Sequence, residues 1–441
     1  MRWTVNTAAL LLLLAVPWAQ AQTQERQTPA QPPNELQALI DAAAPGSVLR
    51  LEPRTYPGNV LIEKPLRIVG RPGTTLQGDR TATVVSIRAD DVTLDTLRIT
   101  GSGKDRSSYE EHAGVRVRGK NAVLSKLELS DNYHGIFLNA SQGTTIKDCT
   151  IVGELGKTLG ARGNGINIIR AHGNHILNNS IARTRDGIGF EYADDNEIHG
   201  NHITQTRYGL HYMYSNRNTF TGNDFSGNVG GAAIMLSEHI TLKGNKFSFN
   251  QGSRAFGVII QAGRDIEVLE NEFHLNQRGL FLEQSTNNRI EKNSFFRNQI
   301  GVELWSNSTA HVFKENVFSR NNTDAVLVGG QGSNAWFENG VGNYWNRPVL
   351  DLDQNGVGDV PLSYESALGN LIRQNELAYL FISSPAIQIY EMTSQLFSGG
   401  ESAITDQFPL LEQPTSRAWI WPALLLAAGL PLLTLALRKR R

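Results

Sequence analysis

A 22-residue repeat runs through the middle of this 441-residue chain and constrains its fold more than any other feature. Short apolar segments that open with glycine recur at steps of 22, 22, 22, 26, 22 and 22 residues, at Gly165, Gly187, Gly209, Gly231, Gly257, Gly279 and Gly301. A second series keeps nearly the same steps and consists of Asn179, Asn201, Asn223, Asn245, Asn271, Asn293, Asn316 and Asn339. Both series place an insertion near residues 249–256, and this agreement indicates a true structural repeat.

The length of the repeat predicts the fold class. Twenty-two residues fit one turn of three short strands with alternating inward and outward side chains, whereas a propeller blade needs more residues. We therefore predict an all-β protein, a right-handed parallel β-helix of about a dozen coils over residues 34–345. Leucine-rich repeats have a similar length, but their leucine and asparagine consensus is absent here. Residues 34–44 predict a short amphipathic helix that caps the first coil.

The asparagine series predicts a corner of the coil, because stacked asparagine side chains can hydrogen-bond from one coil to the next. Cys149 falls on the same position in an earlier coil, so we interpret it as a structural corner residue. It is the only cysteine in the chain, and an intramolecular disulfide is therefore excluded.

The two ends of the chain predict export and membrane attachment. Residues 1–21 combine a basic start, an apolar run and a small-residue cleavage pattern, which is typical of a signal peptide, and residues 22–33 form a Pro- and Gln-rich linker. Residues 418–437 carry no charge and precede four basic residues, which predicts a transmembrane helix, with a buried amphipathic helix as the alternative. The protein is thus predicted to be periplasmic and anchored to the inner membrane. A formal net charge of −1 argues against a nucleic-acid partner.

The repeat stops near residue 345, and we interpret residues 346–413 as a C-terminal segment that docks on a partner. Within it, residues 367–398 are apolar and helix-like in places. An apolar segment that follows a finished coil stack must pack on something, and the last coil, the membrane and another subunit are the three alternatives.

The Gly-led strands predict a candidate metal site on their outward face. The residues one and three positions after each glycine are apolar and should point inward, so those at positions two and four should point outward. On two adjacent coils this places His211, Met213 and Met235 together. Two thioethers and an imidazole suit a soft ion, above all Cu(I). The alternative is that the methionines line a surface that a loop or a partner covers.

A second candidate metal site lies beyond the repeat. The spacing of Asp351, Asp353, Asn355 and Asp359, with Gly356 at the turn, resembles the first nine positions of a calcium-binding loop. Position twelve is Leu362, where such a loop carries a bidentate glutamate. A plain Asx-turn loop without Ca²⁺ is the competing interpretation.

Many secreted β-helices cleave polysaccharides, and this alternative requires acids close together on one face. Glu191 and Glu283 are four coils apart on the candidate face, roughly 19 Å, while Glu283 and Glu303 are on adjacent coils but offset. The register places Asp186 on a face other than the candidate face. We therefore predict that the protein is not an enzyme, although irregular loops at residues 100–112 and 154–163 could still bring acids such as Glu111 over a groove.

Three motifs give the chain a family resemblance. They are Tyr208-Gly-Leu-His-Tyr-Met-Tyr-Ser-Asn216, Gly342-Asn-Tyr-Trp345 and Asp351-Leu-Asp-Gln-Asn-Gly-Val-Gly-Asp359. Together they resemble the NosD family, periplasmic β-helix accessory proteins of nitrous oxide reductase maturation. The resemblance extends over nearly the whole mature chain, from residue 36 to the helical segment near residue 385.

The resemblance implies a non-enzymatic protein that acts with the permease and ATPase subunits of an ABC transporter. It implies that the protein helps to supply copper or sulfur to the multicopper site of nitrous oxide reductase, and a copper chaperone is a further possible partner. It supports the face formed by His211, Met213 and Met235, but it provides no list of ligands. Carbohydrate binding or polysaccharide cleavage stays open as the alternative function.

Overall fold

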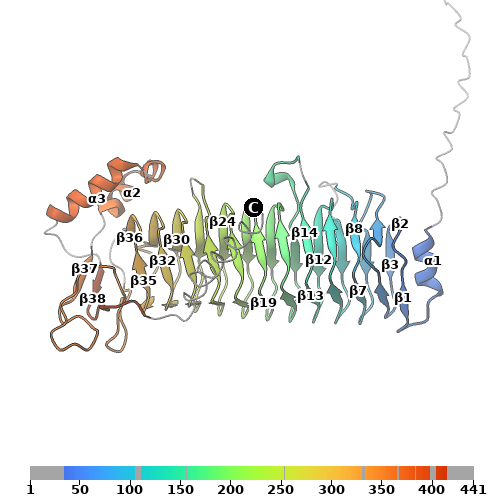
Figure 1. Cartoon of the computed structure of the whole chain (residues 1–441), viewed down its shortest axis with the longest axis horizontal. Helices are drawn as coiled ribbons and strands as arrows, with labels where there is room; N and C mark the ends of the chain where they lie inside the picture. The colour runs from blue at the N-terminus through green and yellow to red at the C-terminus, as the bar shows by residue number, and fades with distance from the viewer. Residues whose placement is uncertain are drawn as a thin grey trace, which may run out of the picture. The chain divides into compact units, whose positions relative to one another are not determined.

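The computed structural model describes residues 34–104, 111–154, 156–252, 254–329, 333–364, 367–382, 384–397 and 404–414. In this part of the chain each coil contributes one strand to each of three 12-stranded parallel sheets (Figure 1). The predicted fold class, a right-handed parallel β-helix, is therefore confirmed. The predicted signal peptide (1–21), linker (22–33) and transmembrane helix (418–437) lie outside the described residues. Among the described residues, no helix is long and apolar enough to cross a bilayer.

Two of the sheets are built from strands of three residues. Sheet A contains β1 (Val48–Arg50), β4 (Arg67–Val69), β7 (Thr93–Asp95), β10 (Val123–Ser125), β13 (Thr145–Lys147), β16 (His175–Leu177), β19 (Glu197–His199), β22 (Thr219–Thr221), β25 (Thr241–Lys243), β28 (Glu267–Leu269), β31 (Arg289–Glu291) and β34 (Val312–Lys314). Sheet B contains β2 (Thr55–Pro57), β5 (Thr75–Gln77), β8 (Arg98–Thr100), β11 (Glu128–Ser130), β14 (Thr150–Val152), β17 (Ser180–Ala182), β20 (His202–Thr204), β23 (Asp224–Ser226), β26 (Lys246–Ser248), β29 (Glu272–His274), β32 (Ser294–Phe296) and β35 (Val317–Ser319).

Sheet C has the longest strands and carries the Gly-led segments of the sequence repeat. It contains β3 (Val60–Ile62), β6 (Val85–Ile87), β9 (Ala113–Val117), β12 (His134–Asn139), β15 (Ile166–Ile169), β18 (Asp186–Glu191), β21 (Tyr208–Met213), β24 (Gly230–Met235), β27 (Phe256–Gln261), β30 (Arg278–Glu283), β33 (Ile300–Trp305) and β36 (Thr323–Val328). Glycine recurs at the start of these strands because neighbouring coils approach closely there. A Cβ atom on Gly187 would lie 2.5 Å from the carbonyl oxygen of Gly209 on the next coil.

The core is a column of stacked apolar side chains from all three sheets. In sheet B the inward position is isoleucine in three successive coils, at Ile151, Ile181 and Ile203, and phenylalanine from Phe225 onward. The phenylalanine rings stack with centroids 4.7 to 5.3 Å apart, from Phe225 through Phe247, Phe273 and Phe295 to Phe318. Trp345 continues this stack at 4.5 Å from Phe318 and closes the core at its C-terminal end.

The asparagine series forms a continuous buried ladder, as predicted. Each side-chain amide donates to the side-chain oxygen of the next asparagine at 2.9 to 3.0 Å, from Asn179 to Asn316. The ladder starts at Cys149, whose backbone N–H donates to Asn179 Oδ1 at 2.9 Å and whose side chain is buried. Its predicted corner role is confirmed, and burial raises the pKa of its thiol to about 12, so the group is unreactive at neutral pH.

The predicted last member of the ladder is wrong. Asn316 donates at 2.9 Å to Asn343, while Asn339 is exposed. A turn closed by an antiparallel bridge between Glu338 and Val341 lengthens this coil and moves the register by four residues. Counting at a constant period could not detect this insertion.

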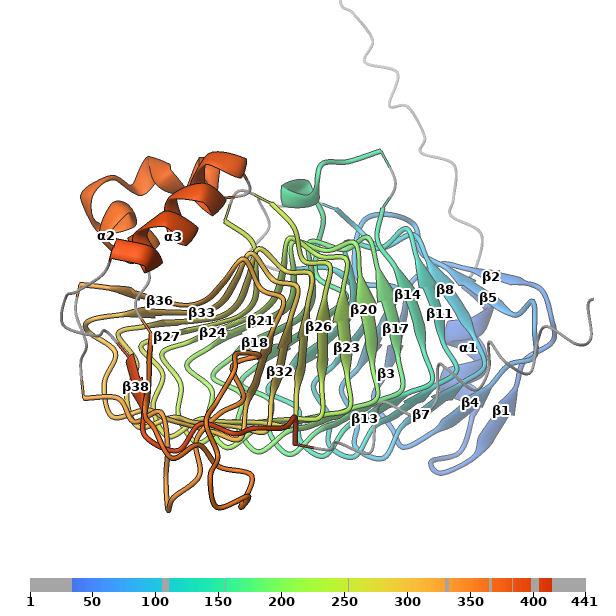
Figure 2. The same cartoon turned by 60° about the vertical axis from the view of Figure 1, so that its left-hand side comes forward.

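A helix covers the N-terminal end of the coil stack, and the C-terminal helices lie against the face of sheet C near its last strands (Figure 2). At the N-terminal end, α1 (Glu35–Ala42) begins at the N-cap Asn34 and buries Leu36 and Ile40. Gln37 pairs its amide with the backbone N–H and C=O of Leu61 in β3, which blocks that strand from pairing with another chain. The predicted N-terminal capping helix is therefore confirmed.

The C-terminal segment is helical as well and returns to the coils. It contains α2 (Ala367–Gln374), the 3-10 helix η2 (Glu376–Phe381) and α3 (Pro385–Phe397), flanked by the antiparallel strands β37 (Leu362–Tyr364) and β38 (Ile404–Asp406). Helix α2 packs its buried Leu368 and Ile372 on Val326 and Val328 of β36. Asp406 accepts hydrogen bonds from the N–H of Asn343 and the indole of Trp345, and so ties β38 to the end of the ladder.

A histidine within a second corner ladder predicts an acid-sensitive fold. His311 stands between Asn288 and Asn334, is fully buried, and accepts the N–H of Asn288 at its Nδ1. Burial lowers its pKa from the ordinary value of about 6.5 to about 4. The unfolded chain therefore binds a proton more tightly, so stability is lost as the pH falls from about 6.5 to about 4, by roughly 3 kcal/mol.

We expect His311→Asn to abolish this loss, because asparagine is neutral at every pH and can continue the ladder. It should also provide an acceptor for the amide nitrogen of Asn288, which is buried without a hydrogen-bond partner. Urea unfolding at pH 7.5 and pH 4.5 measures the effect, with the exposed His239→Asn as the matched control. If the variant retains the same difference between the two pH values as the wild-type protein, the acid sensitivity arises elsewhere.

Candidate functional site

The outward face of sheet C brings the three predicted copper ligands together. Met213 in β21 is the direct register partner of Met235 in β24, and His211 pairs with Ala233. All three side chains are half-buried and reach the surface. On the other side His211 faces Gly189, so small residues leave its ring uncovered along the stack. The predicted juxtaposition is thus present, since paired residues on neighbouring strands lie about 4.8 Å apart.

His211 is held in a fixed orientation by a buried carboxylate. Its Nδ1 atom lies 3.2 Å from Asp186 Oδ2, and Asp186 is 1% exposed. Since a carboxylate only accepts hydrogen bonds, Asp186 favours the tautomer in which Nδ1 carries the proton and Nε2 keeps its lone pair, although Arg207 Nη2 also lies 3.4 Å from Nδ1. A carboxylate behind an imidazole is the usual support of a metal-binding histidine, because it fixes the tautomer and raises the basicity of the ligand atom.

Arg207 compensates the buried charge of Asp186. Its Nε and Nη2 donate to the two carboxylate oxygens at 2.8 and 2.6 Å. Burial opposes ionisation of Asp186, but the hydrogen bonds from His211 and Arg207 outweigh it and hold the pKa of the carboxyl below its usual range. Asp186 therefore stays ionised at neutral pH and remains an acceptor for His211.

A pocket of about 170 Å³ opens beside these ligands. The pocket is lined by His211 and Met213 together with Glu111, Tyr133, His134, Gly163, Asn164, Asn167, Ile169, Arg185, Asp186, Gly189, Phe190 and Glu191. The lining is polar and includes both acidic and basic side chains. A small ligand or the side chain of a partner can therefore approach the imidazole of His211 through this pocket.

A second histidine in the pocket is unsuited to hold a metal. His134 is buried, and its Nδ1 accepts the backbone N–H of Asn164 at 2.9 Å. Its Nε2 must therefore carry the proton, and it lies 3.3 Å from Glu111 Oε2. The contact with His134 holds the pKa of Glu111 below its usual range, so Glu111 remains ionised. This pair is thus a positioning contact that fixes the end of the loop before β9.

Sequence reasoning missed three residues of the site, Asp186, His134 and Arg207, and it named Glu111 only as an acid that its loop could bring over a groove. Asp186 was assigned to another face, but it belongs to β18 on sheet C and pairs with Tyr208. Its position precedes the glycine of the strand, one residue before the part that the pattern covered, and the same is true of His134. Arg207 and Glu111 come from irregular segments between strands, where a repeat has no predictive power.

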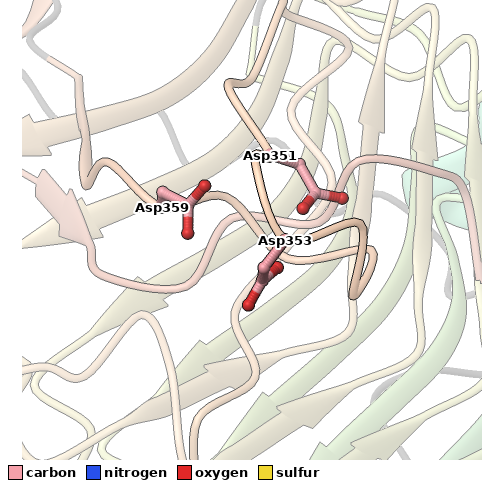
Figure 3. Close-up of side chains that lie close together, drawn as sticks. All are labelled: Asp351, Asp353 and Asp359. Atoms are coloured by element: carbon pink, nitrogen blue, oxygen red, sulfur yellow. The ribbon is translucent and has the colours of Figure 1, made fainter.

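The predicted calcium ligands are only partly brought together. Asp351, Asp353 and Asp359 converge, with one oxygen atom of each within 4.8 Å of the others (Figure 3). Asn355 instead donates its side-chain amide to Asp353 at 2.8 Å. The carboxylates also accept N–H bonds from their own loop, such as Gly356 to Asp351 at 3.0 Å. The loop is therefore stabilised as an Asx turn by its own hydrogen bonds, and Ca²⁺ binding stays a prediction.

The two glutamates considered for polysaccharide cleavage have other partners. Glu283 accepts a hydrogen bond from Gln261 at 2.9 Å. Glu303 is fully buried beneath η2 and accepts hydrogen bonds from Trp305 and Tyr379. A buried and occupied carboxylate cannot act on an external polymer without movement of the helices above it. Glu111 and Asp186, however, line the same pocket, which the register had not predicted.

Comparison with known proteins assigns the chain to a family. The model of the family described as "Periplasmic copper-binding protein (NosD)" matches residues 149–349. A protein of Stutzerimonas stutzeri named "Probable ABC transporter binding protein NosD" is 31% identical over 430 residues, which cover 93% of this chain and 95% of the relative. A protein of the same name from Pseudomonas aeruginosa is 33% identical over 378 residues, which cover 82% of this chain and 87% of the relative.

Solved structures share the fold at low identity. The DFA-IIIase of Arthrobacter chlorophenolicus aligns with a TM-score of 0.50 and 15% identity over 70% of this chain and 96% of its own. A mannuronan C-5 epimerase A-module of Azotobacter vinelandii aligns with a TM-score of 0.48 and 13% identity over 71% of this chain and 94% of its own. At such identities the likeness extends to the parallel β-helix alone. The two relatives matched over most of their length decide the assignment, and the chain belongs to the NosD family of periplasmic copper-binding proteins.

Proposed function

We propose that this protein is a periplasmic accessory factor that carries Cu(I) for assembly of the copper site of nitrous oxide reductase and acts with an ABC transporter. The observation that supports it most is the register pairing of Met213 with Met235 beside an imidazole whose Nδ1 faces a buried carboxylate. Such a donor set favours a soft monovalent ion. Of the two cargoes implied by the resemblance, copper or sulfur, these residues fit copper.

The residues of the site would divide the work of holding the cargo. Met213 and Met235 supply polarisable sulfur atoms from adjacent coils, and His211 supplies Nε2. Asp186 and Arg207 keep the imidazole in the tautomer that leaves Nε2 unprotonated. Because the side chains are half-buried and the pocket opens beside them, a ligand atom of a partner protein can enter and exchange the ion directly.

Contact with the transporter is proposed for the C-terminal helical segment. The segment packs on β36 with one side, but it exposes the large apolar residues Leu377, Leu380, Phe381, Ile389 and Tyr390 on the other, to between 43 and 64%. Exposed apolar clusters of this kind mark contact sites for proteins or membranes. The relatives named as ABC transporter binding proteins support a permease as the partner, next to the proposed inner-membrane anchor at residues 418–437.

We also propose that the protein is not an enzyme. Two of the three acids in the pocket are engaged, Asp186 with Arg207 and His211, and Glu111 with His134 and Asn167, while Glu191 is exposed at the end of β18. The alternative, carbohydrate binding or cleavage, rests on the presence of Glu111 and Asp186 in one pocket. Steady product release from alginate or another polysaccharide, abolished by Glu111→Gln, would replace the accessory function by a lyase or hydrolase activity.

The function is tested in cells that lack the native gene. We expect a strain that carries the His211→Ala, Met213→Ala, Met235→Ala variant to produce nitrous oxide reductase with less copper than a wild-type strain, measured by elemental analysis of the purified enzyme. The Met392→Ala variant controls for the loss of a methionine elsewhere in the mature chain. Fully loaded reductase in the triple variant, with normal amounts of the protein in the periplasm, would refute the proposal.

Asp186→Asn tests the support of His211 separately. Asparagine preserves the shape of the side chain but removes the charge, so the tautomer of His211 is no longer imposed. Loss of such a second-layer partner typically costs 10- to 100-fold in metal affinity, and we expect a decrease of about that size in Cu(I) affinity, measured by competition with a chromogenic chelator. The exposed Asp195→Asn serves as the control, because Asp195 pairs only with Arg217 on the outer surface among the ion pairs of the described residues. An unchanged affinity for Asp186→Asn would mean that His211 is not a ligand.

A further inference from the structure

We infer that the C-terminal helical segment regulates the copper face, because Tyr379 latches it onto sheet C and Trp305 connects it to Met235. Displacement of the segment by its docking partner would release the latch, loosen Met235 and lower the affinity for Cu(I). This inference rests on the proposed function, since it takes Met235 as a copper ligand. It adds a mechanism by which docking near the C-terminal end of the stack controls the copper ion held several coils away.

The latch is a buried polar contact between distant parts of the chain. The hydroxyl of Tyr379 in η2 donates to Glu303 Oε1, and the indole of Trp305 donates to the same atom at 2.8 Å. Glu303 is 0% exposed although it lies on the outward side of β33. The burial of Tyr379 itself, followed by the charge of Glu303, raises the pKa of the Tyr379 phenol, which therefore stays protonated and keeps donating. Tyr379 thus closes a site that would be open if η2 were absent.

The geometry of the buried charges makes the latched state easy to open. Arg278 Nη1 lies 3.7 Å from Glu303 Oε2, beyond hydrogen-bond distance, and Glu303 Oε2 is buried without a hydrogen-bond partner. A buried ion pair repays the loss of hydration only when its geometry is good. Opening the segment would hydrate both charges, so the polar part of the contact opposes opening only weakly.

Trp305 belongs to two packing clusters and connects them. On one side it packs with the cluster in which Leu368, Ile372 and Tyr379 of the helical segment contact β36. On the other side it packs with the outward cluster of Ala233, Phe256, Ile259 and Phe281, which Met235 also contacts. Its ring centroid lies 6.1 Å from that of Phe281. The path from η2 to the copper face is therefore a continuous set of packed side chains.

The same short helix carries both the latch and the exposed docking residues. Leu377, Leu380 and Phe381 are exposed to 63, 64 and 59%, while Tyr379, which lies between them in the sequence, points toward sheet C. The inference takes docking to shift η2, since a shift of this six-residue helix through its three exposed side chains would carry Tyr379 with it. Docking and latch opening are thus coupled, and by linkage copper binding must oppose docking to the same extent.

Tyr379→Phe tests the latch in the full-length protein without any partner. The variant removes one hydroxyl and keeps the ring, so it should fold normally. We expect faster amide exchange in residues 367–382 and 299–306, and a Cu(I) affinity lower by about fivefold, at the low end of ordinary couplings between sites. Tyr344→Phe, which removes a hydroxyl that donates to Asn346 on the surface, is the matched control and should change neither quantity.

The outcomes separate this inference from the proposed function. If Tyr379→Phe accelerates exchange but leaves the Cu(I) affinity unchanged, the segment is latched but not coupled, and the inference is wrong. If exchange is also unchanged, the latch itself is wrong. A wild-type protein whose Cu(I) binding does not depend on Met213 and Met235 would refute the proposed copper site, whereas the exchange result would still decide whether the latch exists. Leu380→Asp, which should prevent co-purification with the transporter, provides the docking control.

Discussion

Cu(I) binding is expected to fall on the order of 100-fold or more in the Met213→Ala, Met235→Ala variant, because loss of a mere outer-layer partner already costs 10- to 100-fold. The two thioethers supply two of the three soft or borderline donors on the face. The substitutions are on the outward side of sheet C and half-buried, so the coil stack should remain intact. Competition with a chelator of known Cu(I) affinity measures the change, and the Cu(I)-sulfur scattering in an X-ray absorption spectrum should disappear with it.

Met392→Ala provides the control for this variant, since it is the remaining methionine of the predicted mature chain and lies in α3. The single variants Met213→Ala and Met235→Ala should each show part of the loss if both sulfur atoms bind one ion. A double variant that binds Cu(I) as tightly as the wild-type protein would mean that the methionines serve only as apolar surface.

Asn223→Ala is expected to destabilise the fold by about 3 to 5 kcal/mol, because it leaves more than one buried polar group without a partner. Asn223 donates to the carbonyl oxygen of Ile198 and to Asn245 Oδ1, both at 2.9 Å. It also accepts the backbone N–H and the side-chain amide of Asn201 at 2.9 Å. Alanine removes all four hydrogen bonds in the dry interior of the corner.

Urea unfolding followed by circular dichroism measures this loss, and the exposed Asn322→Ala serves as the control. Asn322 donates its side-chain amide to Gln299 at the surface, where water can replace the bond. We expect the control to change the free energy of unfolding by less than about 0.5 kcal/mol. A similarly small change for Asn223→Ala would contradict the view that the ladder is a main source of stability.

The coil architecture was predictable because each coil has the same pattern of inward, outward and corner residues. The constant period, the alternation of inward and outward residues and the buried asparagine corner recur coil after coil, so an error in one coil is corrected by its neighbours. The co-facial position of Met213 and Met235 followed from this register alone. Prediction was wrong where one coil departs from the period, as at the turn that replaced Asn339 by Asn343 in the ladder.

The rest of the site depends on contacts that no local pattern encodes. Asp186 meets both His211 and Arg207 across coils, and the arginine lies in the irregular turn before β21. The contact between Tyr379 and Glu303 joins residues 76 positions apart. It exists only because the helical segment folds back on sheet C, which the apolar composition of residues 367–398 left open among three alternatives. Nonrepetitive long-range packing of this kind requires a structure.

The hydrogen-bonded corners make the coil stack a spacer of defined length. From β21, which carries His211 and Met213, to β36, on which α2 packs, the chain makes five coil steps, or roughly 24 Å at about 4.8 Å each. Buried amides that bond in every coil resist both stretching and shear, so this separation cannot vary much with temperature or with the load of cargo. The proposed copper face and the helical segment are therefore held at a fixed distance from each other. A protein that exchanges copper with this face while the segment is docked on its partner must present its own metal site at that distance from the docked segment. Addition or deletion of a whole coil between β21 and β36 would change that distance in steps, with no change in the chemistry of the ligands.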